Sequence, residues 1–349
     1  MDIYWIWLSQ TKYIGAVLQR RLIDQFGSPE KIYCASDSEL RQIPRISQRA
    51  INSLLHNRDL SKAKQILKQC DSQGIQLLTL FDNRYPNYVK KFHDAPILFY
   101  YKGLLKNLSE TVGVVGSRRC SAYGRTIAEK IGMELALHDI TLVSGFAKGI
   151  DSYAQASCLH HAGYVVIFLA GGVDVCYPSE QRNLYEATLN NGGVFLSEHP
   201  PGIKPFYKYF VKRNLFISGW SRKLVVVEAG EKSGALSTAD FAQKQGKPVY
   251  VVPHQIDSLE GKGSNRLLLN GASPYLGIDS IVSFREELNY SIQVQKIGDP
   301  ILQLLSTFPQ SIYSIAQALQ LDEQTIMDKL ITLELEGRII IRGNQVSLL

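Results

Sequence analysis

Short apolar runs alternate with longer segments of helical periodicity through the middle of the chain. The runs are rich in β-branched residues, and they cover residues 112–116, 141–145, 164–172, 194–199, 223–230 and 248–253. Each run is followed by enough residues for a crossover helix, an order that makes neighbouring strands parallel and places helices on both faces of the sheet. The pattern predicts a doubly wound, Rossmann-like α/β domain.

Two further apolar runs precede this core, at residues 77–81 and 97–101, with Tyr-Pro and Ala-Pro pairs between them. Such proline punctuation is typical of turns and strand ends. We expect these runs to extend the sheet beyond a minimal Rossmann unit, so that the α/β domain spans residues 73–290.

The two ends of the chain predict separate modules. Residues 1–72 have the pattern of short helices, broken at "FGSPE" and "IPRIS", and they predict a small helical module. A short linker is expected after Asn289. Residues 298–349 then contain three helical segments followed by two strands joined at Gly343, which is the order typical of a winged helix-turn-helix.

The cysteines and the N-terminal segment indicate the cellular compartment. The five cysteines are widely spaced and form no CxxC pair, which argues against a disulfide framework and a zinc site and indicates a reducing compartment. The N-terminal apolar run has no basic leader and is too short to span a membrane. We therefore expect a cytoplasmic protein without a membrane span.

The first strand of the core leads into an unusual turn, "VGVVGSRRC". Gly116 permits a sharp turn at the carboxyl end of the strand, and the amides of Ser117 and the following residues attract anions at a helix start. A dinucleotide fingerprint needs further glycines and an acidic residue after the next strand, and both are missing. Arg118 and Arg119 favour polymer phosphates or a stacked base instead, although they could also simply solvate the helix start.

A second candidate loop follows the next strand, in "SGFAKGID". Lys148 lies between two glycines there, and it is expected at the same edge of the sheet as Arg118, the edge where ligands bind in open α/β sheets. Asp151 fits the first turn of a helix, where a carboxylate is favourable without any catalytic role.

The net charge of +6 is informative only because part of it is concentrated. Residues 201–223 have no acidic residue and six basic ones, which are Lys204, Lys208, Lys212, Arg213, Arg222 and Lys223. Cations interleaved with aromatic residues suit a single nucleic-acid strand, whose bases stack while its phosphates are neutralised. Most of these aromatic residues are expected to pack on the sheet, and Phe210 is the one singled out as a stacking candidate. A third glycine-containing turn, at residues 230–234, is another possible phosphate site.

Together these motifs resemble the bacterial DNA-processing protein A (DprA/Smf) family. The resemblance rests on "VGVVGSRRCSAYG", "LVSGFAKGIDSYAQ", "AGGVDVCYPSEQRNLYE" and "FVKRNLFISGWSRKLVVVEAGEKSGALSTADFA" in this order, and it covers about residues 77–290. The N-terminal helices are similar to the SAM or helix-hairpin-helix-like extension of many members, and the C-terminal module is similar to their winged helix.

The resemblance implies a single-stranded DNA-binding recombination mediator, usually a homodimer, that uses no cofactor. It also implies that the protein helps load the RecA recombinase onto incoming DNA covered by single-strand-binding protein during natural transformation. Carried over by position, the DNA site comprises Gly116, Ser117, Arg118, Arg119, Lys148, Phe210, Lys212, Arg213 and Asn214. No catalytic or metal-binding residue is expected.

The chain also departs from the family pattern. Leu215 stands where members commonly carry a second arginine, and Ser179 stands where some carry a lysine. The helical module lacks the glycine hairpin of DNA-binding helix-hairpin-helix motifs, so we assign it no DNA binding. Residues 299–349 contain six acidic and three basic residues, which disfavours docking in a major groove and favours contact with protein.

One enzyme class is kept as the alternative. A nucleotide phosphoribohydrolase of the lysine-decarboxylase-like group has a related Rossmann core and a glycine-rich turn between strand and helix. It would need "PGGxGT" and a downstream glutamate, which "EAGEKSGALST" does not supply.

Overall fold

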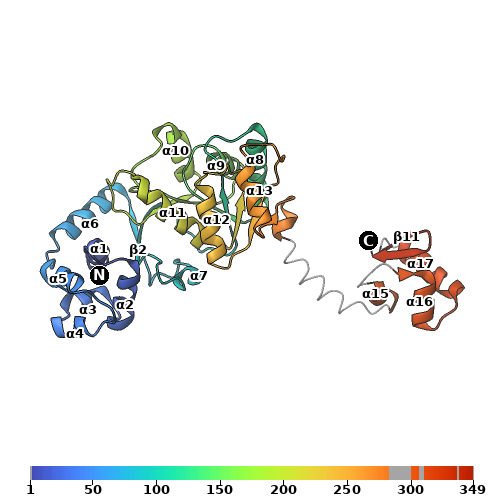
Figure 1. Cartoon of the computed structure of the whole chain (residues 1–349), viewed down its shortest axis with the longest axis horizontal. Helices are drawn as coiled ribbons and strands as arrows, with labels where there is room; N and C mark the ends of the chain where they lie inside the picture. Colours follow the sequence, from blue (N-terminus) through green and yellow to red (C-terminus); the bar gives the residue numbers. More distant parts are fainter. Residues whose placement is uncertain (1, 283–299, 306–309, 336–337, 349) are drawn as a thin grey trace. The chain divides into compact units, whose positions relative to one another are not determined.

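The computed structural model describes residues 2–282, 300–305, 310–335 and 338–348. Its parts form two compact units, Met1–Ser280 and Ile281–Leu349. The linker expected after Asn289 lies outside the described residues. Figure 1 draws both units, and each is considered by itself below.

Among the described residues, nine strands of the first unit form one sheet, in the order β1-β2-β6-β5-β4-β3-β7-β8-β9. All neighbours from β6 to β9 run parallel, whereas β2 is antiparallel to both β1 and β6. The strands are β1 Gln76–Thr79, β2 Leu98–Gly103, β3 Thr111–Val115, β4 Thr141–Ser144, β5 Val165–Phe168, β6 Val194–Ser197, β7 Lys223–Val226, β8 Val249–Val251 and β9 Ser273–Pro274. The predicted α/β sheet and its two-strand extension are confirmed, and the short β9 is an addition.

Helices cover both faces of this sheet (Figure 1). Those that follow β3, β4 and β5 pack beside one another, and those that follow β6 and β7 pack together as a second pair. The crossover helices are α8 Ala122–Leu137, α9 Ile150–His160, α10 Arg182–Asn190, α11 Tyr207–Trp220 and α12 Ala235–Lys244. Two shorter helices are α7 Asn87–Lys90, before β2, and α13 Lys262–Leu269, after β8. Strand order reverses between β3 and β7, which is where doubly wound sheets open a ligand site.

Aromatic side chains fill the core under α11. Trp220 is fully buried and its ring lies 5.8 Å from Phe99 and 5.3 Å from Phe168, both on the sheet. Phe216 contacts the same two rings. Their burial confirms the packing expected for Phe216 and Trp220 and fixes α11 firmly against that face. Phe206 and Tyr207 of the basic segment are exposed instead, so the expectation that most of its aromatic residues pack on the sheet is wrong for them.

The N-terminal helices pack against this domain within the same unit. They are α1 Asp2–Gln10, α2 Ala16–Phe26, α3 Pro29–Cys34, α4 Asp37–Arg41, α5 Gln48–His56 and α6 Ser61–Gln73. Serines cap three of them, and Ser36 forms a capping box with Glu39, which explains why short helices begin at these points. Helix α1 contacts both α6 and β2, so the predicted helical module adjoins the sheet through α1.

The second unit has its own core and a small sheet. Its helices are α15 Pro300–Leu305, α16 Ile312–Leu319 and α17 Glu323–Leu335, and its strands are β10 Gln310–Ser311, β11 Ile339–Arg342 and β12 Gln345–Leu348, paired in the order β10-β12-β11. Ile326, Leu330 and Ile339 are fully buried in its core. The elements follow the predicted order, with β10 as an addition, and the assignment as a winged helix stays a prediction.

Candidate nucleic-acid interface

A cavity of about 590 Å³ lies at the strand-order reversal, between the turns that follow β3 and β7. Three segments far apart in the sequence line most of it. They are residues 115–119 after β3, residues 210–217 of α11 in part, and the turn and helix start at residues 230–238. Ala147 and Asp151 contribute from the loop and helix after β4. Most of the predicted site residues therefore meet in one place.

The β3 turn presents two exposed guanidinium groups beside this cavity. The backbone N–H of Ser117 donates to the carbonyl of Glu228 at 2.7 Å, and the Ser117 hydroxyl donates to the carbonyl of Arg119 at 2.9 Å. Arg118 and Arg119 are exposed, and neither has an ion pair among the described residues. Their charges are thus available to an anion.

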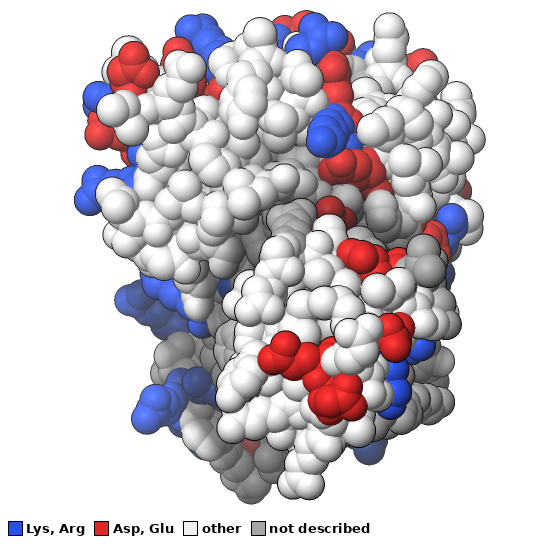
Figure 2. Space-filling model, turned by 90° about the vertical axis from the view of Figure 1, so that its right-hand side faces the viewer, with Lys and Arg blue, Asp and Glu red and all other residues white. Residues whose placement is uncertain are grey.

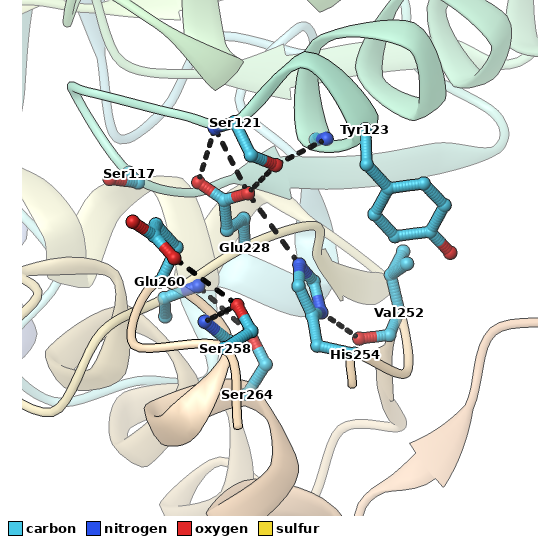
Figure 3. Close-up of polar contacts among 12 residues, drawn as sticks. Ser117, Ser121, Tyr123, Glu228, Val252, His254, Ser258, Glu260 and Ser264 are labelled. Carbon is cyan, nitrogen blue, oxygen red and sulfur yellow. Dashed lines mark hydrogen bonds and ion pairs between the residues drawn. The ribbon is translucent and has the colours of Figure 1, made fainter. Parts of the chain in front are cut away.

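A buried carboxylate anchors the far end of the same turn (Figure 3). Glu228, two residues after the end of β7, is fully buried and accepts hydrogen bonds from the N–H of Ser121 at 3.0 Å and 3.2 Å and from its hydroxyl. Ser121 caps α8, and its hydroxyl oxygen also accepts from the N–H of Gly124 at 3.0 Å. A Cβ at Gly124 would lie 2.6 Å from Oε2 of Glu228, so glycine is needed for this approach. Glu228 therefore holds both ends of the arginine turn.

A histidine lies behind this carboxylate (Figure 3). Nε2 of His254 is 3.6 Å from Oε2 of Glu228, and Nδ1 is 2.9 Å from the carbonyl of Val252. Because the Ser121 hydroxyl is bonded to Glu228 and not to His254, the three side chains do not have the order of a hydrolytic triad. The cluster is suited to positioning the turn and not to nucleophilic catalysis.

Helix α11 forms the opposite wall of the cavity. Phe210 is half-buried, and the guanidinium carbons of Arg118 and Arg213 lie 5.4 Å and 5.8 Å from its ring centroid. The Tyr177 ring is 6.1 Å away. Asn214 donates to the Gly234 carbonyl at 3.2 Å and to the Ser237 hydroxyl at 3.0 Å, which ties α11 to the start of α12. Phe210 is the aromatic side chain in the cavity lining, as the sequence suggested.

Arg213 lies deeper than Arg118, among buried residues of the fold. It is 6% exposed, and its guanidinium donates to the carbonyl of Phe168 at 2.8 Å. Burial lowers its pKa to about 10, so the group stays charged at neutral pH. Burial raises the pKa of Asp151 to about 6, while Arg213 and the backbone N–H groups of Ala147 and Gly116 act in the opposite direction. Asp151 thus forms a buried anionic floor, in keeping with a role at the helix start.

Two predicted lysines fall outside the cavity lining. Lys148 is exposed in the loop after β4, and its ammonium pairs with Glu180 at 2.9 Å. Lys212 points to the other flank of α11, where it pairs with Glu198 and approaches the N-terminal helices. Helical periodicity explains this, because residues two positions apart on a helix do not share a face. Neither lysine therefore lines the cavity with Arg118. Lys148 still lies at the expected sheet edge, since the N–H of Ile150, two residues on, donates to the carbonyl of Ser117 at 3.2 Å. A DNA contact by either lysine stays a prediction.

The excess of positive charge is not spread as a broad basic surface over the face drawn in Figure 2. Small groups of acidic and of basic side chains lie scattered there among uncharged residues. In the second unit, two acidic side chains have local structural partners. Asp322 accepts from the N–H of Thr325 at 2.9 Å, and Glu334 accepts from the N–H of Ile341 at 2.8 Å. Part of that unit's acidity is thus used within its own fold.

Sequence reasoning missed Glu228 and Lys232. Glu228 follows the apolar run of β7, and an acidic residue at the end of a buried strand is the sequence signal that marks it. Lys232 lies in the turn after β7 and joins the cavity lining, but only the fold brings this turn next to Arg118. Within the described ranges, no three His, Cys, Asp or Glu side chains gather as metal ligands, and no helix is long and apolar enough to cross a membrane.

Known proteins resemble this chain in both sequence and structure. A model of the family described as DNA recombination-mediator protein A matches residues 76–286. Protein Smf of Synechocystis is 33% identical over 285 residues, which cover 80% of this chain and 71% of that protein. DNA processing protein DprA of Bacillus subtilis is 33% identical over 230 residues, covering 65% of this chain and 77% of that protein.

Two solved structures share the fold. The X-ray structure of DNA processing protein A from Streptococcus pneumoniae matches with a TM-score of 0.71 and 26% identity, covering 81% of this chain and 98% of that one. A structure that describes a single-stranded DNA binding mode of the Helicobacter pylori protein matches with a TM-score of 0.54 and 28% identity, covering 61% and 96%. The comparisons do not favour the phosphoribohydrolase alternative. With the family model matched over more than half of its length, this chain belongs to the family of DNA recombination-mediator protein A, the DNA-processing proteins called Smf and DprA.

Proposed function

We propose that this protein binds single-stranded DNA in the cavity between the β3 and β7 turns and acts as a recombination mediator without catalysis of its own. The observation that carries the proposal is the pairing of the exposed Arg118 guanidinium with the half-buried Phe210 ring in one cavity. Family membership and the DNA-binding relative from Helicobacter pylori support it.

The cavity offers the two kinds of contact that an unpaired strand needs. Phe210 and the Arg118 plane supply a stacking surface for a base, and an unpaired base presents its face without the cost of opening a duplex. Arg119, Lys232 and the amides at the start of α12 supply charge and donors for adjacent phosphates. In this scheme Arg213 acts from below, as a positioning residue for Phe210.

Fluorescence anisotropy with labelled single-stranded and duplex oligonucleotides tests the proposal. We expect a preference for the single strand. With roughly 3 to 5 phosphates neutralised, log affinity should fall with log salt at a slope of about −2 to −3.5. Phe210→Ala should weaken binding by about 1–3 kcal/mol, the usual worth of one stacked base, and Arg118→Ala should weaken binding and make the salt slope shallower.

Lys244→Ala is the matched control. Lys244 is an exposed cation at the far end of α12 and pairs with Asp240 at 2.7 Å, so its loss removes the same charge away from the cavity. Wild-type affinity in both Arg118→Ala and Phe210→Ala, or equal losses in all three variants, would refute the cavity as the DNA site.

We further propose that the bound strand is passed to the RecA recombinase, including strands covered by single-strand-binding protein, as in uptake of DNA by natural transformation. A mediator must hold the DNA as an unpaired single strand, and the cavity can hold a strand in that form. The test is RecA filament formation on single-stranded DNA coated with single-strand-binding protein. We expect faster filament formation with this protein and none of that gain with Arg118→Ala; equal rates with and without the wild type would reject mediation.

A cytoplasmic homodimer completes the proposal. Leu269 and Leu276 are 88% and 80% exposed and flank β9, one of the two edge strands of the described sheet. Apolar side chains beside an unpaired strand edge favour self-association. Light scattering should give twice the chain mass, and Leu269→Lys should shift the protein toward monomer; a monomeric wild type would reject the dimer.

A further inference from the structure

Helix α11 separates the DNA cavity from a second hollow that borders the N-terminal helices. This second hollow has a volume of about 480 Å³ and is lined by Gly15, Ala16, Val17, Leu18, Arg21, Arg45, Asp94, Lys212 and Leu215. The proposed function makes no use of it. Its lining combines an aliphatic floor with basic side chains from two different modules.

A ridge of α11 that carries Val211 and Leu215 lies between the two hollows. Val211 lines the first cavity and is 54% exposed, and Leu215, one helical turn further on, lines the second. Residues four apart on a helix are neighbours on its surface. The exposed Lys208 lies one turn before Val211 and Lys212, so a cation stands on the ridge itself. A ligand leaving the first cavity over Val211 would arrive at Leu215.

The basic groups of the second hollow are held by the helical module. Arg21 of α2 is half-buried and donates to the carbonyl of Pro44 at 3.2 Å. This bond fixes the loop that carries Arg45, an exposed residue whose backbone is left-handed at φ 58°. A left-handed conformation is unfavourable for an arginine and persists only where its surroundings impose it. The loop therefore presents Arg45 in a set position at the rim.

Basic side chains outnumber acidic ones around the second hollow. Glu198 lies under Lys212 with a 13% exposed side chain and offsets that charge. Glu198 does not line the hollow, and Asp94 is the acidic residue in its lining. Against these stand Arg21, Arg45 and Lys212, with Lys208 on the ridge beside them, so positive groups outnumber negative ones along the whole route from the first cavity.

We propose that the second hollow binds the continuation of the same single-stranded DNA, whose backbone crosses α11 between Lys208 and Val211. Arg21 and Arg45 would contact phosphates, and the planar Arg45 side chain together with Leu215 would take a base, since unstacked bases also stack on guanidinium planes. This proposal rests on the DNA-binding function above and gives the N-terminal module a part in it, although the module lacks a glycine hairpin motif.

Oligonucleotide length separates the second hollow from the first. A strand of about 5 nucleotides is expected to occupy the first cavity alone, whereas one of about 20 reaches both, by the usual site sizes for such proteins. The double variant Arg21→Ala/Arg45→Ala should bind the short oligothymidylate as the wild type does. Its affinity for the long one should fall about tenfold at moderate salt, and the salt slope for the long strand should become shallower by about 1.4, as for two lost phosphate contacts.

Arg49→Ala is the control, because Arg49 is an exposed arginine on α5 of the same module and does not line the hollow. Unchanged long-strand affinity in the double variant would overturn the proposal and leave the hollow to another ligand, such as a protein segment. Equal losses for both lengths would overturn it as well, because the variant would then be acting on the first cavity. If the wild type binds neither length, or if Arg118→Ala binds both normally, the proposed function itself fails.

Discussion

Glu228→Gln tests whether a buried carboxylate positions the arginine turn. Glu228 is fully buried at the end of β7, and its two oxygens accept the N–H and the hydroxyl of Ser121, while its backbone carbonyl accepts the N–H of Ser117. Arg118 and Arg119 lie between these two serines. The substitution leaves size and shape almost unchanged but removes the charge and turns one acceptor into a donor.

The magnitude follows from the bonds that change. A hydrogen bond to a charged acceptor contributes about 1.5–3 kcal/mol, and an amide N–H aimed at another donor leaves both groups unsatisfied. Glutamine keeps one carbonyl oxygen, so one bond can persist. We expect the free energy of unfolding to fall by about 2–3 kcal/mol. Affinity for single-stranded DNA should fall by about tenfold, because the turn would no longer hold its guanidinium groups in place before binding.

Two measurements on the full chain check this prediction. Urea unfolding gives the stability change, and anisotropy under conditions where the variant is folded gives the affinity change. Glu129→Gln, at a half-buried surface position of α8 paired with Arg125 at 2.9 Å, should alter stability by less than about 0.5 kcal/mol. Unchanged stability would refute the energetic argument, and a destabilised variant that binds DNA normally would refute the positioning role of Glu228.

Two further predictions concern the floor of the cavity. Gly145→Ala would place a Cβ 2.3 Å from an Arg213 nitrogen, so we expect a loss of about 1–3 kcal/mol of stability from overpacking. Gly219→Ala in α11 has nothing within 4 Å of its added Cβ and should gain about 0.5–1 kcal/mol. Similar urea midpoints for the two variants would contradict the close packing of Arg213. The pKa of Asp151 is raised from 3.8 to about 6, so its contribution to stability is fully present below pH 4 and is lost as pH rises through about 6, by about 3 kcal/mol in total. Asp151→Asn should remove this pH dependence of stability. The DNA affinity of the wild type, but not of the variant, should rise as pH falls from neutral through 6, because Asp151 loses its negative charge. Parallel pH profiles of wild type and variant would disprove this.

The sequence by itself determined the secondary structure and most of the sheet. Strands such as β3 and β5 are short apolar runs whose burial on both faces leaves a plain signal, and crossover lengths fix their parallel order. The arginine turn was also readable, because strand, glycine and helix start are local in the chain. Phe210 could be separated from Phe216 and Trp220 only as a hypothesis, since all three lie on one helix.

Tertiary structure decided which charges share a surface. Lys212 and Arg213 are adjacent in the chain, yet one faces the N-terminal helices and the other is buried under the cavity between the β3 and β7 turns, because α11 is fixed by the aromatic core around Trp220. The roles of Glu228 and Asp151 likewise depend on contacts between segments remote in sequence. Local propensity reports what one segment can form by itself, whereas the environment of a charge depends on the other segments that the fold packs around it.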